Sequence, residues 1–279
     1  MYRRQRSLFL SAMLLLFLYP SLLYDGYCAE ELYKYREKDG TWIITDKPRN
    51  PSVSKDPETT RNYLQLLSEG HAHAKSGDLH RALDAYSKAI EQNSKDPEGY
   101  VGRGACYAHL GNHQLAEKDF DTAIRLDPEN YQAYWNRGLL HCTLGNFDNA
   151  VDDYSRVIDL KEDFAMAYAN RGWVYRNRLR NSQEAIHDYS MAIKLKAGSA
   201  LVYYHRACAL LDTRKYREAA EDLSKAIELE QDFAGAYALR GFVYQEYLGQ
   251  PEKGEKDIEY AKKLLGKTPI GKPGMPFTP

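Results

Sequence analysis

Small residues recur through most of this chain at a fixed period of 34 residues. One series occupies the same slot of each period: Gly70, Gly104, Gly138 and Gly172, then Ala207 after 35 residues, then Gly241. Two further series keep this spacing: Ala82, Ala116, Ala150, Ala185, Ala219 and Gly254, and Ala89, Ala123, Val157, Ala192, Ala226 and Ala261. Three series with one period predict a stacked array of similar two-element units instead of one globular core. Such an array favours a binding function over catalysis.

Each period has the pattern of two amphipathic helices joined by a short turn. Over residues 131–144 and again over 147–160, apolar and small residues recur three and four positions apart, which predicts one apolar face per helix. Gly145 and Asn146 supply the backbone freedom that a tight turn between them needs. The small residues are expected where the two helices approach most closely, because a larger side chain would push the helix axes apart.

This pattern resembles the tetratricopeptide repeat family. The match is most complete in one unit, at Tyr100, Gly104, Tyr107, Gly111, Ala116, Phe120, Ala123 and Pro128. Six units are expected, over residues 63–96, 97–130, 131–164, 165–199, 200–233 and 234–266. The resemblance implies an all-α, right-handed superhelical solenoid of six helix-turn-helix repeats.

Arginine and aspartate follow the same period. An arginine precedes the small residue of the first helix at Arg103, Arg137, Arg171, Arg206 and Arg240, and an aspartate recurs in the second helix at Asp119, Asp153, Asp188, Asp222 and Asp257. Their separation is 16 or 17 residues, and the longer value coincides with a longer turn. The first unit has Glu69 and Ala85 instead, so both members are absent together. We therefore expect an ion pair between the two helices of units two to six. A basic stripe for an anionic ligand is the alternative.

The first 29 residues have the composition of an export signal. Arg3, Arg4 and Arg6 precede an uncharged, leucine-rich run over residues 8–23. An uncleaved membrane anchor and lipidation at Cys28 are alternatives. Each of them places the repeats outside the cytoplasm, in the periplasm or at the periplasmic face of a bacterial membrane.

Short segments of different composition flank the repeats. Residues 30–50 predict a β-hairpin around Asp39 and Gly40, preceding the solenoid, and resemble a module of unknown function from exported bacterial proteins. Residues 51–62 have the composition of a linker, and residues 267–279 that of a flexible tail rich in proline and glycine.

The sequence shows no recognisable catalytic chemistry. Its 38 basic and 39 acidic residues are interspersed, which argues against nucleic-acid binding, and no phosphate-binding glycine loop is present. The histidines lack the spacing of a metal site, and no nucleophile is paired with a base. We expect no enzyme activity, no cofactor and no metal. Cys106, Cys142 and Cys208 are expected as buried thiols, with one disulfide and one free thiol as the alternative.

The family resemblance implies a concave groove lined by the first helices, which holds a protein or peptide segment. The groove residues carried over are Trp135, Leu139, Met166, Trp173, Arg176, Asn177, Tyr204, Leu211, Asp212, Phe242, Gln245 and Glu246. The expected function is a protein-interaction scaffold or assembly adaptor of the bacterial cell envelope. The large groove residues would alternatively pack neighbouring helices together. Binding of glycans in cell-wall or polysaccharide export is a second function, and an enzyme with an unrecognised site is a third.

Overall fold

The computed structural model describes residues 33–36, 42–45, 57–195 and 198–266. The chain divides into two compact units, residues 1–53 and residues 54–279. The expected export segment (1–29) and tail (267–279) lie outside the described residues.

Two short strands are described within residues 1–53. β1 (Tyr33–Arg36) and β2 (Trp42–Thr45) pair antiparallel, with Tyr33 opposite Thr45 and Arg36 opposite Trp42. The connection expected around Asp39 and Gly40 lies outside the described residues, as do the flanks of the expected hairpin module.

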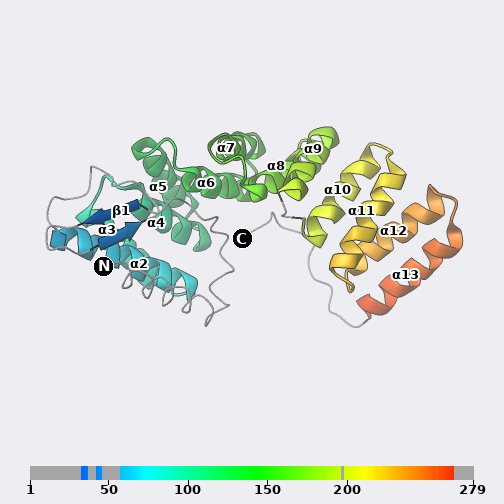
Figure 1. Ribbon diagram of the computed structural model, residues 1–279, viewed down its shortest axis with the longest axis horizontal. Coiled ribbons are helices and arrows are strands. Elements are labelled where there is room, and N and C mark those ends of the chain that lie inside the picture. Colours follow the sequence, from blue (N-terminus) through cyan, green and yellow to red (C-terminus); the bar gives the residue numbers. More distant parts are fainter. Residues whose placement is uncertain (1–32, 37–41, 46–56, 196–197, 267–279) are drawn as a thin grey trace, which may run out of the picture. The chain divides into compact units, whose positions relative to one another are not determined.

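The described part of residues 54–279 is an all-helical solenoid of helix-turn-helix pairs (Figure 1). The first helices of the six pairs are α2 (Pro57–Lys75), α4 (Pro97–His109), α6 (Tyr131–Leu144), α8 (Ala165–Asn177), α10 (Ala200–Asp212) and α12 (Ala234–Glu246). The second helices are α3 (Leu79–Gln92), α5 (His113–Leu126), α7 (Phe147–Leu160), α9 (Ser182–Lys194), α11 (Tyr216–Leu229) and α13 (Pro251–Leu265). Each helix packs against its neighbours in sequence, and α4 also contacts the first helices on either side, α2 and α6. First helices therefore lie beside first helices.

The first helix begins earlier than the sequence pattern predicts. α2 starts at Pro57, so residues 57–62, which were expected to belong to a linker, form its first turns. Proline suits this position because the first helical residue needs no backbone N–H donor, and Glu58 complements the helix dipole in the first turn. The linker expectation for these residues is wrong.

Close helix packing explains the periodic small residues. Tyr154 of α7 is fully buried against Gly138 of α6, where an added Cβ would lie 2.8 Å from the tyrosine ring. The alanines Ala82, Ala116 and Ala150 of the second helices are likewise fully buried. Apolar clusters form between successive helices along the array, so each pair is stabilised by its neighbours.

The turns within the pairs adopt left-handed backbone conformations. Four of them place a glycine there: Gly77, Gly111, Gly145 and Gly249, with φ between 62° and 82°. The turns of units four and five instead use Arg180 (φ 54°) and Arg214 (φ 61°). A side chain in this region is strained because its Cβ crowds the backbone carbonyl oxygen. Both arginines therefore occupy a conformation that glycine would adopt without strain.

Candidate functional site

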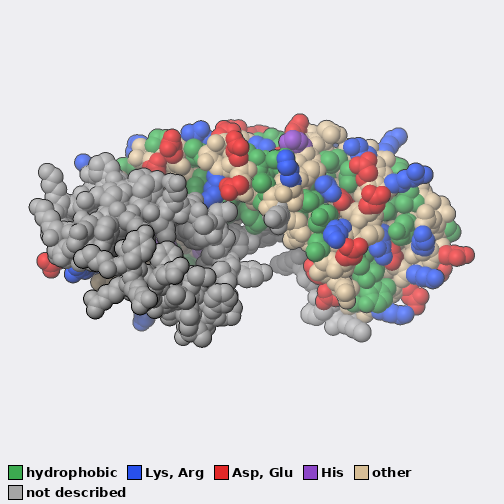
Figure 2. All heavy atoms as spheres, viewed as in Figure 1, with side chains coloured by type: hydrophobic (Ala, Val, Ile, Leu, Met, Phe, Trp, Pro, Cys, Tyr) green, Lys and Arg blue, Asp and Glu red, His purple; other side chains and the backbone are tan. Residues whose placement is uncertain are grey.

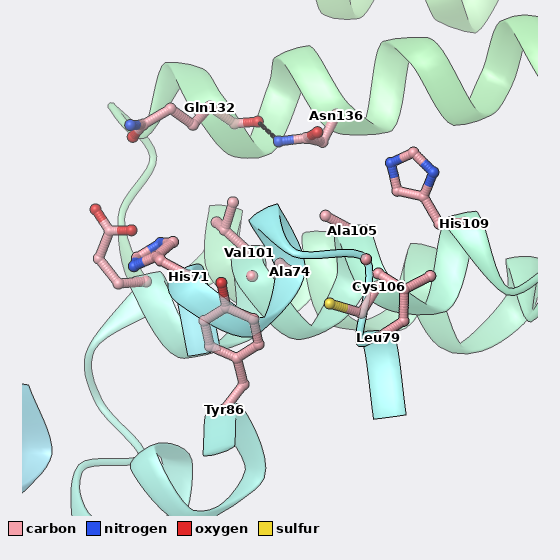
Figure 3. Close-up of a pocket in the computed structure, with 13 residues that line it drawn as sticks. His71, Ala74, Leu79, Tyr86, Val101, Ala105, Cys106, His109, Gln132 and Asn136 are labelled. Atoms are coloured by element: carbon pink, nitrogen blue, oxygen red, sulfur yellow. Dashed lines mark hydrogen bonds between the residues drawn. The ribbon is translucent and has the colours of Figure 1, made fainter. Parts of the chain in front are cut away.

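A hollow of about 540 Å³ lies between the first helices of units one to three. Its walls include His71 and Ala74 of α2, Val101 and Ala105 of α4, and Gln132 and Asn136 of α6. In Figure 3, the two α6 side chains lie across the gap from the residues of α2 and α4. The hollow is therefore part of the surface that the first helices share.

Small side chains on α4 open this hollow. Ala105 occupies a slot that holds Leu139, Trp173 and Phe242 in units three, four and six. Gly102, three residues earlier, occupies a slot that is Asn136 in unit three and His205 in unit five. A Cβ at Gly102 would lie 2.4 Å from the ring of Tyr86, so the absence of a side chain lets that ring form part of the wall.

The hollow has an apolar floor and a polar rim. The floor includes the Tyr86 ring and Cys106; burial raises the pKa of Cys106 to about 11 and that of Tyr86 above its ordinary value, which keeps both groups neutral. His71 meets Tyr86 edge-on with 5.5 Å between the ring centroids. On the α6 side, the Asn136 amide donates a hydrogen bond of 2.8 Å to the Gln132 carbonyl oxygen. This chemistry suits an apolar side chain inserted beneath a polar backbone.

Two tryptophans expected in the groove lie in the interior. Trp135 is 6% exposed and packs edge-on against Phe164, with 5.0 Å between ring centroids. Trp173 is 7% exposed and lies in the same apolar cluster, beneath the Arg178 guanidinium. For both tryptophans the structure favours the packing alternative, because little of either ring is left for a partner.

The other expected groove residues are divided between packing and surface. Leu139 and Met166 pack against the cluster that contains the tryptophans, and Tyr204 and Leu211 pack against the cluster of units five and six. Asn177 donates a hydrogen bond to the Trp173 carbonyl oxygen, and Arg176 pairs with Asp212 at 2.9 Å. Phe242 is 45% exposed, Glu246 is exposed and Gln245 is half-buried. The structure thus joins Arg176, Asn177 and Asp212 at one place.

Each periodic arginine lies against the aspartate expected for it. In unit four, Arg171 donates from Nε and Nη2 to the two Asp188 carboxylate oxygens, at 2.9 Å each. The pairs Arg103–Asp119, Arg137–Asp153, Arg206–Asp222 and Arg240–Asp257 have the same two-bond geometry. The aspartates are buried, so these pairs stabilise helix packing and leave no row of free cations for an anionic ligand.

Each of these arginines also has a second hydrogen-bonding partner, which the sequence reasoning missed. Arg171 Nη1 donates to Ser155 Oγ of the preceding unit at 2.9 Å. The equivalent acceptors are Ser87, Asp121, Ser190 and Ser224. Every acceptor precedes its arginine by 16 residues, so the signal was present in the spacing. One guanidinium therefore connects two units.

Comparison with protein-family models identifies these units. One model of the tetratricopeptide repeat matches residues 67–130, 110–163 and 137–200, and a second matches residues 200–233. Together they cover more than half of the chain. The chain belongs to the tetratricopeptide repeat (TPR) family. The matches do not reach residues 30–50, so the resemblance of that segment to a module of exported proteins is not supported.

Solved TPR structures share this fold at low sequence identity. The pilF protein of Pseudomonas aeruginosa is 14% identical with a TM-score of 0.66, covering 76% of this chain and 95% of its own. YrrB, described as a TPR protein with an unusual peptide-binding site, is 20% identical with a TM-score of 0.60 and coverages of 66% and 94%. The MamA protein is 24% identical with a TM-score of 0.54 and coverages of 63% and 95%. No curated protein matches the chain.

The described TPR surface carries both charges. In Figure 2, acidic and basic side chains are interspersed over the described helices of the face shown.

Among the described residues, no cluster of three or more His, Cys, Asp or Glu side chains is arranged to hold a metal ion. No described helix combines the length and apolar character needed to cross a bilayer. Cys106, Cys142 and Cys208 are buried free thiols.

The hollow was not predicted from the sequence. All of the groove residues expected from the family resemblance lie in units three to six. A signal was nonetheless available. Gly102 and Ala105 are the small members of two first-helix slots that hold larger residues in units three and six. Comparing side-chain volumes slot by slot along the repeats would have located the opening in unit two.

Proposed function

We propose that this TPR protein is a non-enzymatic interaction scaffold that binds a partner segment in the hollow of units one to three. The observation that carries this proposal is the opening between α2, α4 and α6, which the small side chain of Ala105 leaves unfilled and whose wall includes the Tyr86 ring packed against Gly102. Its apolar floor would hold one large apolar side chain of the partner, and the amides of Gln132 and Asn136 would meet the partner's backbone. The peptide-binding site described for YrrB, which shares the fold, supports this class of ligand.

The test fills the hollow without changing charge. The chain from Glu30 onward is used to select peptides from a displayed random library, and their affinities are then measured for the variant Ala105→Leu. Leucine is tolerated at this slot in unit three, as Leu139, so the helix pair should remain folded. We expect binding to weaken at least tenfold, because the leucine side chain takes the space of the anchoring group.

The control is Ala72→Leu, which adds the same side chain to an exposed position of α2 that does not line the hollow. It should leave affinity unchanged. Peptides that bind both variants as tightly as the unsubstituted chain would place the interface elsewhere and contradict the proposal.

We further propose that the scaffold acts outside the cytoplasm, in the bacterial cell envelope. The support is the basic start and apolar run of residues 1–29. A fusion of these residues to alkaline phosphatase, which is active only after export, should be active in a bacterial host. An inactive fusion would contradict export.

A further inference from the structure

Two consecutive turns carry a concentration of basic side chains. Arg178 and Arg180 belong to the turn between α8 and α9, and Arg214 and Lys215 to the turn between α10 and α11, with Arg217 in the first turn of α11. All five side chains are exposed. These residues are called the basic turn edge.

The cations of the basic turn edge are not neutralised within the described part of the chain. None of the five forms an ion pair with a described residue, whereas the five periodic arginines are all paired with aspartates. Arg178 lies over the rings of Phe147 and Trp173, at 5.0 and 5.3 Å from their centroids, which orients its guanidinium without removing its positive charge. Within residues 176–184 and 212–218, the acids are Glu184, Glu218 and Asp212, and Asp212 is occupied.

The two turns are held together by a defined contact. Asp212, at the end of α10, accepts a hydrogen bond of 2.9 Å from Arg176 Nε of α8 and another of 2.9 Å from Ser182 Oγ of α9. The cations of both turns are therefore presented side by side on a fixed support. Such preorganisation reduces the entropy lost when a partner binds.

The backbone adds a second, independent observation. Arg180 and Arg214 are the two described non-glycine residues with positive φ, and they occupy the turn position that is glycine in the other four units. Glycine would adopt this backbone conformation without strain. Neither side chain contributes an ion pair with a described residue, and both guanidinium groups are exposed to solvent.

We propose that the basic turn edge binds an acidic protein segment, rich in Asp or Glu, as a second contact surface of this protein. Arginine forks favour carboxylates, with which they form two parallel hydrogen bonds. The edge lies at the C-terminal ends of the first helices α8 and α10, and the first helices α2, α4 and α6 form the hollow. An extended polypeptide is therefore the class of partner that fits the array. Five cations set against Glu184 and Glu218 leave a net excess of three positive charges, which complements a short acidic segment. The inference does not depend on occupancy of the hollow.

The test removes charge while relaxing the backbone. In the double variant Arg180→Gly/Arg214→Gly, glycine accommodates the positive φ, so the melting temperature should stay the same or rise. The probe is a fluorescein-labelled peptide of alternating glutamate and glycine, with its glutamine counterpart as the neutral reference. Fluorescence anisotropy at low salt should show binding of the acidic probe to the full chain, weakened about tenfold in the double variant.

A matched control separates the edge from net charge. Lys95→Gln/Arg125→Gln also removes two exposed positive charges, but from units one and two, and should leave the acidic probe bound. Ala105→Leu should likewise have no effect on this probe, so that failure of the hollow and failure of the basic turn edge are distinguished.

Three outcomes would overturn the inference: no binding of the acidic probe, equal loss in the charge-matched control, or equal binding by the double variant. A fourth is loss of binding to phosphatidylserine vesicles in the double variant without any binding of the peptide, which would assign the edge to a membrane surface instead.

Discussion

At the residue scale, Arg171 shows how one side chain ties three helices together. Its guanidinium bonds to Asp188 of α9 and Ser155 of α7 from its own position on α8, and the Asp188 side chain is 1% exposed. Asp188→Ala would leave the partly buried guanidinium without its counter-charge, and we expect a loss of roughly 3 kcal/mol in the free energy of unfolding. A double-mutant cycle with Arg171→Met, followed by urea titration, should give a coupling of about 1–3 kcal/mol. Additive losses in the double variant would show that the interaction between Arg171 and Asp188 does not itself contribute to the free energy of unfolding.

His205 provides a pH-dependent test of a half-buried residue. Burial, reinforced by the charge of Arg176, lowers the pKa of His205 from its ordinary value of 6.5 to about 4. Between these values the unfolded chain binds a proton that the folded chain does not, so stability falls as the pH drops through this window. We expect this histidine to account for about 2 kcal/mol of the stability lost between pH 7 and pH 5. Asn170 occupies the equivalent position in unit four, so His205→Asn is the substitution that tests this. Identical pH profiles for the two proteins would contradict the assignment.

At the scale of the helix pair, the fit between Gly138 and Tyr154 decides how closely α6 and α7 approach. A methyl group at Gly138 would lie 2.8 Å from the tyrosine ring. We expect Gly138→Ala to destabilise the protein by about 1–3 kcal/mol, because the helices must separate or the ring must leave its rotamer. Unit five already contains the compensated version, since Ala207 replaces glycine where Leu223 replaces the aromatic residue. Adding Tyr154→Leu to Gly138→Ala should therefore recover part of the loss, as measured by thermal unfolding. A further loss in the double variant would mean that the two positions are not coupled.

The helix pairs also show what the sequence could predict and what it could not. α4 begins at Pro97 and α6 at Tyr131, where the period places the starts of units two and three, because local patterning repeats identically in each unit. The period also identifies the face that the first helices share, but not the depth of each side chain on it. Trp135 and Trp173 belong to that shared surface by register and are nonetheless buried, because neighbouring helices close around large rings. The hollow opens at Ala105, where a small side chain leaves space that the neighbours do not fill.

At the scale of the whole repeat array, a series of isoleucines links one unit to the next. Ile90, Ile124, Ile158, Ile193 and Ile227 follow the third small-residue slot of units one to five. Each packs towards the following first helix: Ile124 joins a cluster with Ala133 of α6, and Ile227 one with Ala236 of α12. In α13 the equivalent residue is Lys262, which is exposed. A charged residue at this position makes α13 a polar end of the described array, because a seventh unit would have to bury the ammonium group.

We therefore expect Lys262 to limit self-association. Lys262→Ile would complete the isoleucine series on an exposed helix and create a surface that matches the inter-unit contacts, so we expect concentration-dependent association. Sedimentation velocity should show a larger weight-average mass for this variant than for the unsubstituted protein. Lys263→Ile is the matched control: it makes the same change on α13, one residue away, in the slot that is the exposed Glu228 in unit five. Association of both variants to the same extent would reflect general apolar exposure. Association of Lys262→Ile alone would show that a single lysine separates the end of this solenoid from a surface that accepts another unit.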